Sequence, residues 1–261
     1  MRRSTAAAII LSSLSYACES NPIIPTAPTP APSVPVSPAP APPVVQPRGL
    51  VTITIDDGWR STYINAFPIL DAAGLKTTNY IITGRFNATG YIGPQEVLSL
   101  QARGHEIGAH SRSHLDLAPM TQVQLQSEVA GSRTDLLNIG VQSVTTFAYP
   151  FGIYTPGIVQ VVREAGFASA RATDGGLNMP TGDRFTLKRQ SVGGAVTLAH
   201  VQSWVDSAVE NRAWLILLVH HVDTTIGDFS ITPQLFQEIV TYLVNKQVRV
   251  VTMAQGLQMV P

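Results

Sequence analysis

The chain has 261 residues, 44% of them hydrophobic and 13% charged, which suits a buried globular core of one large or two small domains. It carries 17 basic and 17 acidic side chains and no basic stripe that could bind a phosphate backbone, so nucleic acid is excluded as a partner. Cys18 is the only cysteine, which excludes a disulfide within the chain.

The N-terminal sequence predicts an export signal over residues 1–17. Two arginines precede a short apolar stretch over 6–14, and small residues follow where a signal peptidase would read them. The stretch is shorter than the roughly 20 residues of a membrane-spanning helix. Cys18 directly follows Ala17, as in a lipoprotein signal that ends in a lipidated cysteine, although such signals prefer Leu where Ser15 stands. Ordinary cleavage after Ala17, or a frayed helix of a cytoplasmic protein, are the alternatives.

Residues 18–47 are predicted to be a disordered linker. From Pro22 to Pro47 the chain is almost wholly Pro, Ala, Val, Ser and Thr, and this stretch holds 11 of the 19 prolines. It can form few backbone hydrogen bonds and should run as an extended polyproline-like spacer, with a reach of about 80 Å at about 3.1 Å per residue. The alternative is that this Pro-rich segment has no role. The folded domain is then expected over 48–261.

From residue 49 onward, apolar strand-like runs alternate with helix-like segments that have start and stop signals. The predicted strands cover 50–55, 77–82, 106–109, 144–148, 167–170, 214–219 and 248–252. The predicted helices are one ending at Gly74 and others over 94–104, 121–140, 155–166, 197–211 and from Thr232. Near-continuous apolar strands predict a parallel α/β sheet covered by helices on both faces. About seven such units favour a single barrel, with a doubly wound sheet as the alternative.

Two polar clusters stand at the ends of predicted strands. Asp56 and Asp57 follow the first strand, and His110 and His114 follow the third. Neighbouring carboxylates and two imidazoles four residues apart could hold a metal ion that activates water. Three more polar side chains, Tyr149, Arg171 and His220, also fall at strand ends. Because parallel barrels build their active sites at the carboxyl ends of strands, these residues predict one site.

The clusters Thr54-Ile55-Asp56-Asp57-Gly58, His110-Ser111-Arg112-Ser113-His114, Tyr149-Pro150-Phe151-Gly152 and Leu218-Val219-His220 occur together in one order. In this order the chain, from about residue 51 to about 257, resembles the polysaccharide deacetylase family (NodB-homology domain, carbohydrate esterase family 4). The resemblance implies a distorted, incomplete (β/α) barrel of about seven strands. It also implies removal of acetyl groups from a carbohydrate polymer: N-acetylglucosamine units of peptidoglycan, chitin or an exopolysaccharide, or O-acetyl groups of xylan.

The resemblance also implies the metal and the catalytic groups. Asp57, His110 and His114 would hold one divalent ion, with Zn²⁺ expected first and Co²⁺ or Ni²⁺ as alternatives. Asp56 matches the general base and His220 the general acid.

The pocket residues follow from the same resemblance. The backbone N–H of Phe151 would stabilise the oxyanion, and Tyr149 and Leu218 would line the substrate pocket. His221 competes with His220 for the acid role, but the spacing from Leu218 favours His220 because side chains alternate along a strand.

Two departures from the family pattern raise questions about the base and the acid. Ala148 stands where the family often has an Arg that pairs with the base, so we expect Arg171 to reach Asp56 instead, with Arg189 as the next candidate. The family's Asp-x-x-Asp-Trp segment is absent. Asp174 is a candidate to tune His220, and its alternative is a turn residue.

Trp59 could stack on a sugar ring or pack against the following helix. His105 has no counterpart among the family's ligands, and we interpret it as structural.

The expected partner is an acetylated polysaccharide substrate. The protein is expected to be an exported monomer that contacts a membrane only through a lipid on its N-terminal cysteine. Two other functions stay open. One is hydrolysis of a small amide by the same groups. The other is glycan binding by a catalytically decayed relative.

Overall fold

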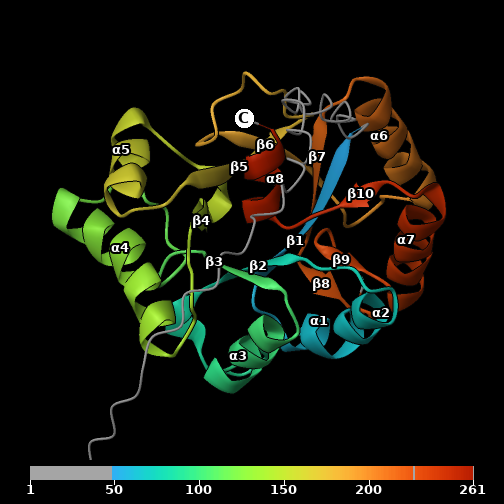
Figure 1. Ribbon diagram of the computed structural model, residues 1–261. Helices are drawn as coiled ribbons and strands as arrows, with labels where there is room; N and C mark the ends of the chain where they lie inside the picture. Colours follow the sequence, from blue (N-terminus) through green and yellow to red (C-terminus); the bar gives the residue numbers. More distant parts are fainter. Residues whose placement is uncertain (1–48, 226, 261) are drawn as a thin grey trace, which may run out of the picture. The chain divides into compact units, whose positions relative to one another are not determined.

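The computed structural model describes residues 49–225 and 227–260, so the predicted signal, Cys18 and the predicted linker lie outside the described residues. Seven parallel strands form the sheet of a barrel (Figure 1). They are β1 (Leu50–Asp57), β2 (Thr78–Ile81), β3 (Glu106–Ala109), β4 (Thr146–Ala148), β5 (Ser169–Gly175), β6 (Leu187–Ser191) and β7 (Trp214–Val219). β7 pairs with β1 from Leu50 to Ile55, which closes the ring. The predicted barrel of about seven strands is confirmed.

Most of the helices form an outer layer around the strands (Figure 1). They are α1 (Arg60–Asn65), α2 (Phe67–Ala72), α3 (Pro94–Ala102), α4 (Gln122–Asn138), α5 (Pro156–Glu164), α6 (Leu198–Glu210) and α7 (Pro233–Lys246), with short 3₁₀ turns η1 (Thr83–Arg85) and η2 (Pro150–Gly152). Among the described residues, none of the helices is both long and apolar enough to span a bilayer.

Strand β1 shows how alternation sets up the site. Val51, Ile53 and Ile55 pack into the main core between strands and helices. The residues between them have the opposite orientation and face the barrel interior, where Thr52 accepts a hydrogen bond from the Trp214 indole at 2.9 Å. The same alternation turns Asp56 inward at the carboxyl end of the strand.

Helix α8 (Met253–Met259) closes the opposite, amino end of the barrel. Its first N–H groups donate to the Thr78 hydroxyl from Met253 and to the Glu106 carboxylate from Ala254, each at 2.8 Å. In the view of Figure 1, α8 overlaps the middle of the ring of strands and stands apart from the outer helices. Because this end is filled, the carboxyl end is the open end of the barrel.

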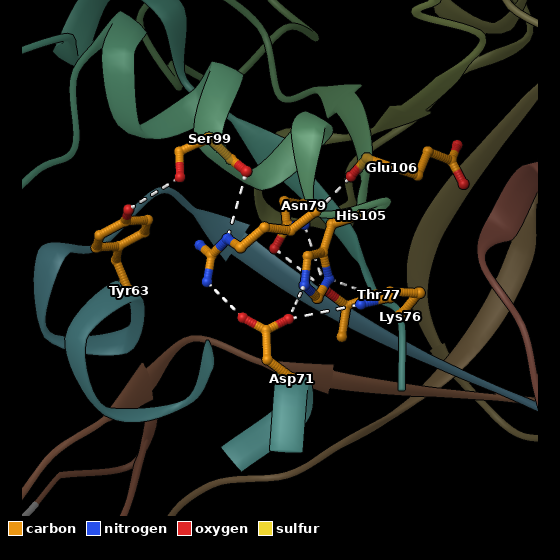
Figure 2. Close-up of polar contacts among 9 residues, drawn as sticks. Tyr63, Asp71, Lys76, Thr77, Asn79, Ser99, His105 and Glu106 are labelled. Atoms are coloured by element: carbon orange, nitrogen blue, oxygen red, sulfur yellow. Dashed lines mark hydrogen bonds and ion pairs between the residues drawn. The ribbon is translucent and has the colours of Figure 1, made fainter. Parts of the chain in front are cut away.

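The amino end also holds the polar network of Figure 2. His105 accepts a hydrogen bond from the Thr77 N–H at Nδ1 (3.2 Å), and its Nε2 lies 3.2 Å from an Asp71 oxygen. Arg103 binds the other Asp71 oxygen at 2.6 Å. Burial lowers the pKa of His105 to about 4 against the opposing pull of Asp71, so the ring is neutral. The structural interpretation of His105 is in accord with these contacts.

Several elements differ from the sequence-based expectation. Strand β6 was not predicted, because its sequence Leu-Lys-Arg-Gln-Ser has neither alternation nor an apolar run. The predicted last strand is only β10 (Arg249–Val250), which pairs with the start of β1 outside the ring of seven. The predicted helix before Gly74 is two helices that meet at Ala66, because Pro68 cannot continue the hydrogen bonding of α1. A two-stranded ladder, β8 (His221–Val222) with β9 (Ser230–Ile231), follows β7.

Candidate metal centre and active site

Three side chains at the carboxyl ends of β1 and β3 form a candidate metal centre. Asp57 ends β1, while His110 and His114 lie in the loop that follows β3, and one ligand atom of each lies within 4.8 Å of the others. The Asp57 Oδ1 atom is 3.4 Å from His110 Nε2 and 3.7 Å from His114 Nε2. One carboxylate and two imidazoles form a donor set suited to Zn²⁺, Co²⁺ or Ni²⁺.

The hydrogen bonding of these residues fits a metal ion. His110 donates from Nδ1 to the Ala148 carbonyl at 2.8 Å, which leaves the lone pair of Nε2 facing Asp57. The Asp57 Oδ1 atom is buried and has no hydrogen-bond partner within the described part of the chain. Burial lowers the pKa of His114, and His110 adds to this effect, so His114 is held in the neutral form that binds metals. A cation would satisfy the orphaned oxygen.

Helix α4 holds the loop that carries both histidines. One Glu128 oxygen accepts from the backbone N–H groups of Arg112 (3.0 Å) and Ser113 (2.8 Å), and the other accepts from the Ser113 hydroxyl. Asp135 binds the Arg112 guanidinium through two N–H groups, each at 2.7 Å. Between them, a Cβ added at Gly131 would lie 2.5 Å from Arg112 Cζ. We call Glu128, Gly131 and Asp135 the α4 stripe, since their spacing places them on one helix face.

The loop needs such support because its backbone is strained. Ser111 and His114 have φ angles of 59° and 56°, a left-handed conformation that side chains disfavour. The Ser111 hydroxyl accepts from the His114 N–H at 3.0 Å, which fixes one strained residue against the other. The stripe and this bond together determine where the two imidazoles lie.

Asp56 forms a buried ion pair with Arg171. Both side chains are almost fully buried, and Arg171 Nη2 donates to Asp56 Oδ2 while Nη1 donates to the Ala172 carbonyl at 3.0 Å. The guanidinium lies over the Tyr80 ring, 5.3 Å from its centre. Burial alone would raise the pKa of Asp56, but Arg171, and behind it His110 and His220, bring that pKa below its usual value. Asp56 is therefore a carboxylate.

This contact is the one predicted from the sequence. Ala148 on β4 is the direct neighbour of Arg171 on β5 in the sheet register. The guanidinium thus comes from the strand next to the position where the family often has its Arg. The catalytic role of Arg171 stays a prediction.

Trp59 supports the metal centre and lines one wall. Its indole N–H donates to Asp57 Oδ2 at 2.8 Å, which leaves the other carboxylate oxygen toward the histidines. Its ring stacks on Tyr91 at 4.2 Å and lies 4.3 Å from the ring of His221. Trp59 thus packs against protein rings and also borders the cavity described below.

His220 and His221 both reach the site from the end of β7. The His220 carbonyl accepts from the Thr62 hydroxyl at 2.6 Å, which ties the chain after β7 to α1. Burial lowers the pKa of His220, opposed by the charges of Asp56 and Asp57. His221 instead lies 3.7 Å from an Asp223 oxygen.

The turn η2 and the residue before it also border the site. Tyr149 is buried and its hydroxyl donates to the Phe185 carbonyl at 3.0 Å, so only its ring borders the site. Phe151 has a φ of 57° and is 57% exposed, with its ring 4.6 Å from that of His114.

Two further candidates have different surroundings. Arg189 on β6 reaches the cavity, whereas Asp174 is exposed and accepts a hydrogen bond from the Tyr154 hydroxyl at 3.3 Å. The carboxylates that raise the pKa of His220 are Asp56 and Asp57. These contacts therefore do not support Asp174 as the residue that sets the pKa of His220.

A cavity of about 380 Å³ brings these groups together at the carboxyl ends of the strands. Every candidate except Asp174 lines it: Asp56, Asp57, Trp59, His110, His114, Tyr149, Phe151, Arg171, Arg189, Leu218 and His220. The volume lies in the range of small-ligand sites, about 300 to 1,000 Å³. A parallel barrel with a cavity of this kind at the carboxyl ends of its strands belongs to the class of (β/α) barrel enzymes.

Comparison with known proteins narrows this class. The family model described as polysaccharide deacetylase matches residues 44–170, and over this segment the chain belongs to that family. The peptidoglycan-N-acetylmuramic acid deacetylase PdaA of Bacillus subtilis (strain 168) is 27% identical over 164 residues, covering 59% of this chain and 60% of PdaA. Four curated relatives are matched over 8% to 60% of their own length, so the chain spans less than two thirds of each.

Solved structures share the fold. A family 4 acetyl xylan esterase from Clostridium thermocellum, in complex with a cobalt ion, is 19% identical with a TM-score of 0.60, over 80% of this chain and 91% of that one. The Streptococcus pyogenes deacetylase PplD, in complex with acetate, is 21% identical with a TM-score of 0.57, over 59% of this chain and 69% of that one. Arg171, Arg189, Leu218 and His220 lie beyond the segment that the family model matches.

Sequence reasoning missed the residues that support the site. Glu128 and Asp135 read as ordinary polar positions of a helix, and Phe229, which packs 5.2 Å from His220, lies in a loop without a motif. The spacing of Glu128, Gly131 and Asp135 on one face was the only available signal.

Proposed function

We propose that this protein is a metal-dependent hydrolase that removes acetyl groups from a carbohydrate polymer. The observation that carries the proposal is the Asp57, His110 and His114 cluster beside the buried pair of Asp56 and Arg171. Membership in the polysaccharide deacetylase family supports it. Zn²⁺ is the first candidate for the ion, with Co²⁺ and Ni²⁺ as alternatives, and one solved structure with the same fold is a complex with a cobalt ion.

Each residue of the site has a separate role in the proposed hydrolysis. When bound, a divalent ion supplies Lewis acidity and lowers the pKa of a coordinated water. Asp56 accepts the proton of the attacking water, and Arg171 fixes the orientation and the charge of this carboxylate. The fixed donor at Phe151 N–H stabilises the oxyanion, and Leu218 with Tyr149 encloses the acetyl methyl.

His220 completes the reaction by protonating the leaving amine or alcohol. Because burial lowers its pKa, a protonated His220 releases its proton readily to the leaving group. His220, directly after β7, and Phe151, in η2, both line the cavity.

The substrate is an acetylated glycan such as peptidoglycan, chitin, an exopolysaccharide or xylan. Relatives of both kinds occur, since one is a peptidoglycan-N-acetylmuramic acid deacetylase and another an acetyl xylan esterase. The export signal, the lipid on Cys18 and the Pro-rich spacer are part of the proposal, as a tethered monomer could then reach a polymer beyond its anchor.

The test is acetate release across N-acetylated and O-acetylated glycans, with small amides as a further set, before and after chelation. The proposal expects release from at least one glycan, loss on chelation and recovery with Zn²⁺ or Co²⁺. Release from small amides alone would favour the amide hydrolase, and glycan binding without any release would favour the decayed protein. Either result would overturn the proposal.

A further inference from the structure

Arg189 is a half-buried cation in the cavity, and its side chain has no ion-pair partner in the part of the chain that the structure describes. It extends from β6, and its buried Nε atom has no hydrogen-bond partner among residues 49–225 and 227–260. In those residues the arginine ion pairs involve five others: Arg60, Arg103, Arg112, Arg163 and Arg171. A buried polar group without a partner in a site requires an explanation.

The nearby charges do not supply that partner. Arg171 already holds Asp56 and the Ala172 carbonyl, so the base has its cation. Burial lowers the pKa of Arg189, and the charge of Arg171 adds to this, against weaker opposing effects of Asp56 and Asp174. Because a guanidinium stays charged at any ordinary pH, the cost of its partial burial falls when an anion enters the cavity.

We infer that Arg189 binds a carboxylate of the substrate, so that the enzyme acts on acetylated glycans that carry acidic sugars. This rests on the proposed function and specifies its substrate class. The Nε and one Nη of a guanidinium form a planar fork that matches the two oxygens of a carboxylate. Arg189 lines the same cavity as the metal-ligand candidates, and its Nε has no hydrogen-bond partner within the described part of the chain.

Two kinds of acetylated sugar present this chemistry. A uronic acid carries the carboxylate on the sugar ring carbon chain, and a muramic acid carries it on an ether-linked lactyl group. The experiment therefore uses an oligosaccharide containing N-acetylmuramic acid and an acetylated glucuronoxylan oligosaccharide. Each is paired with its own methyl ester, which removes the charge and keeps the rest of the molecule.

The kinetic arm compares wild type, Arg189→Gln and Arg189→Lys, each loaded with Zn²⁺. Wild type is expected to favour at least one acid over its ester by about 10- to 100-fold in kcat/KM, mainly through KM, because a charged hydrogen bond is lost in the ester. Arg189→Gln should abolish the preference by lowering kcat/KM on the acid to the level measured on the ester, and Arg189→Lys should restore part of it. Lys188→Gln, an exposed charge on the same strand, is the matched control and should change nothing.

A binding arm separates this inference from the proposed function. Calorimetry with the deacetylated acids and their esters needs no turnover, and wild type should bind an acid more tightly than Arg189→Gln does. Acid-selective binding that depends on Arg189, without any acetate release, would overturn the proposed function and keep the inference. Equal binding of acid and ester by wild type would overturn the inference, as would an equal loss of kcat on acid and ester in Arg189→Gln.

Discussion

Arg171 reaches Asp56 from β5, beside the β4 position where the family often carries its Arg. The guanidinium has three contacts at once: the Asp56 carboxylate, the Ala172 carbonyl and the face of Tyr80. A small ammonium cannot satisfy all three, because it lacks the planar fork. We therefore propose that Arg171 is the residue that orients the base.

Arg171→Lys tests this. The variant keeps a positive charge beside Asp56, so we expect the free energy of unfolding to change little compared with the loss in turnover. We expect kcat to fall by about tenfold or more, with KM nearly unchanged, because the base is misoriented in the transition state. Arg163→Lys, which alters an exposed ion pair with Asp183, is the control. Unchanged kcat in Arg171→Lys would remove Arg171 from the mechanism and make Arg189 the next residue to test.

Helix α4 supports the loop that carries His110 and His114. Glu128→Gln keeps the size of the side chain but removes its charge and one of its two acceptor oxygens, which together hold the Arg112 and Ser113 backbone and the Ser113 hydroxyl. We expect the affinity for Zn²⁺ to fall about 10- to 100-fold, the usual effect of losing a supporting group behind a metal ligand. Competition with a chromogenic chelator measures the change, and Glu164→Gln on α5 serves as the control. Wild-type affinity in Glu128→Gln would show that the loop holds its shape without the stripe.

An element could be predicted from the sequence when the pattern that specifies it lies within a few neighbouring residues. The apolar strands and the capped helices α4, α5 and α7 could be predicted because alternation, caps and prolines are written into a few neighbouring residues. Strand β6 could not, since Leu-Lys-Arg-Gln-Ser becomes a strand only by pairing between β5 and β7. The metal-ligand candidates share short motifs, whereas Glu128 and Asp135 join the site through tertiary contacts that no short segment reveals.

In the whole molecule, the residues that close the barrel and those that form the candidate active site lie at opposite ends. The amino end is closed by α8 and by the network around His105, and the carboxyl end holds the metal centre and the cavity. His105 is neutral in the folded protein at a pH where the unfolded chain would protonate it, because its folded pKa is about 4 against an ordinary value of 6.5. The unfolded state then binds more protons, so stability should decrease as the pH falls from about 6.5 toward 4.

His105→Gln should remove this part of the pH dependence. Between pH 7 and pH 5 the wild type is expected to lose about 2 kcal/mol more of its unfolding free energy than the variant, from about 1.4 kcal/mol per pH unit below 6.5. Urea denaturation at each pH measures the difference, and the other histidines cancel because both proteins share them. Parallel pH profiles for the two proteins would contradict the assignment of His105.

In the proposed mechanism Asp57 binds a metal ion while its neighbour Asp56 acts on water. The most direct measurement is the Zn²⁺ content and affinity of purified wild type, Asp56→Asn and Asp57→Asn, read together with turnover. We predict about one ion per chain in wild type and in Asp56→Asn, with turnover in the latter reduced roughly 100-fold or more. Asp57→Asn should lose both the ion and the activity. Equal metal loss in the two variants, or full activity of wild type after exhaustive chelation, would contradict the account.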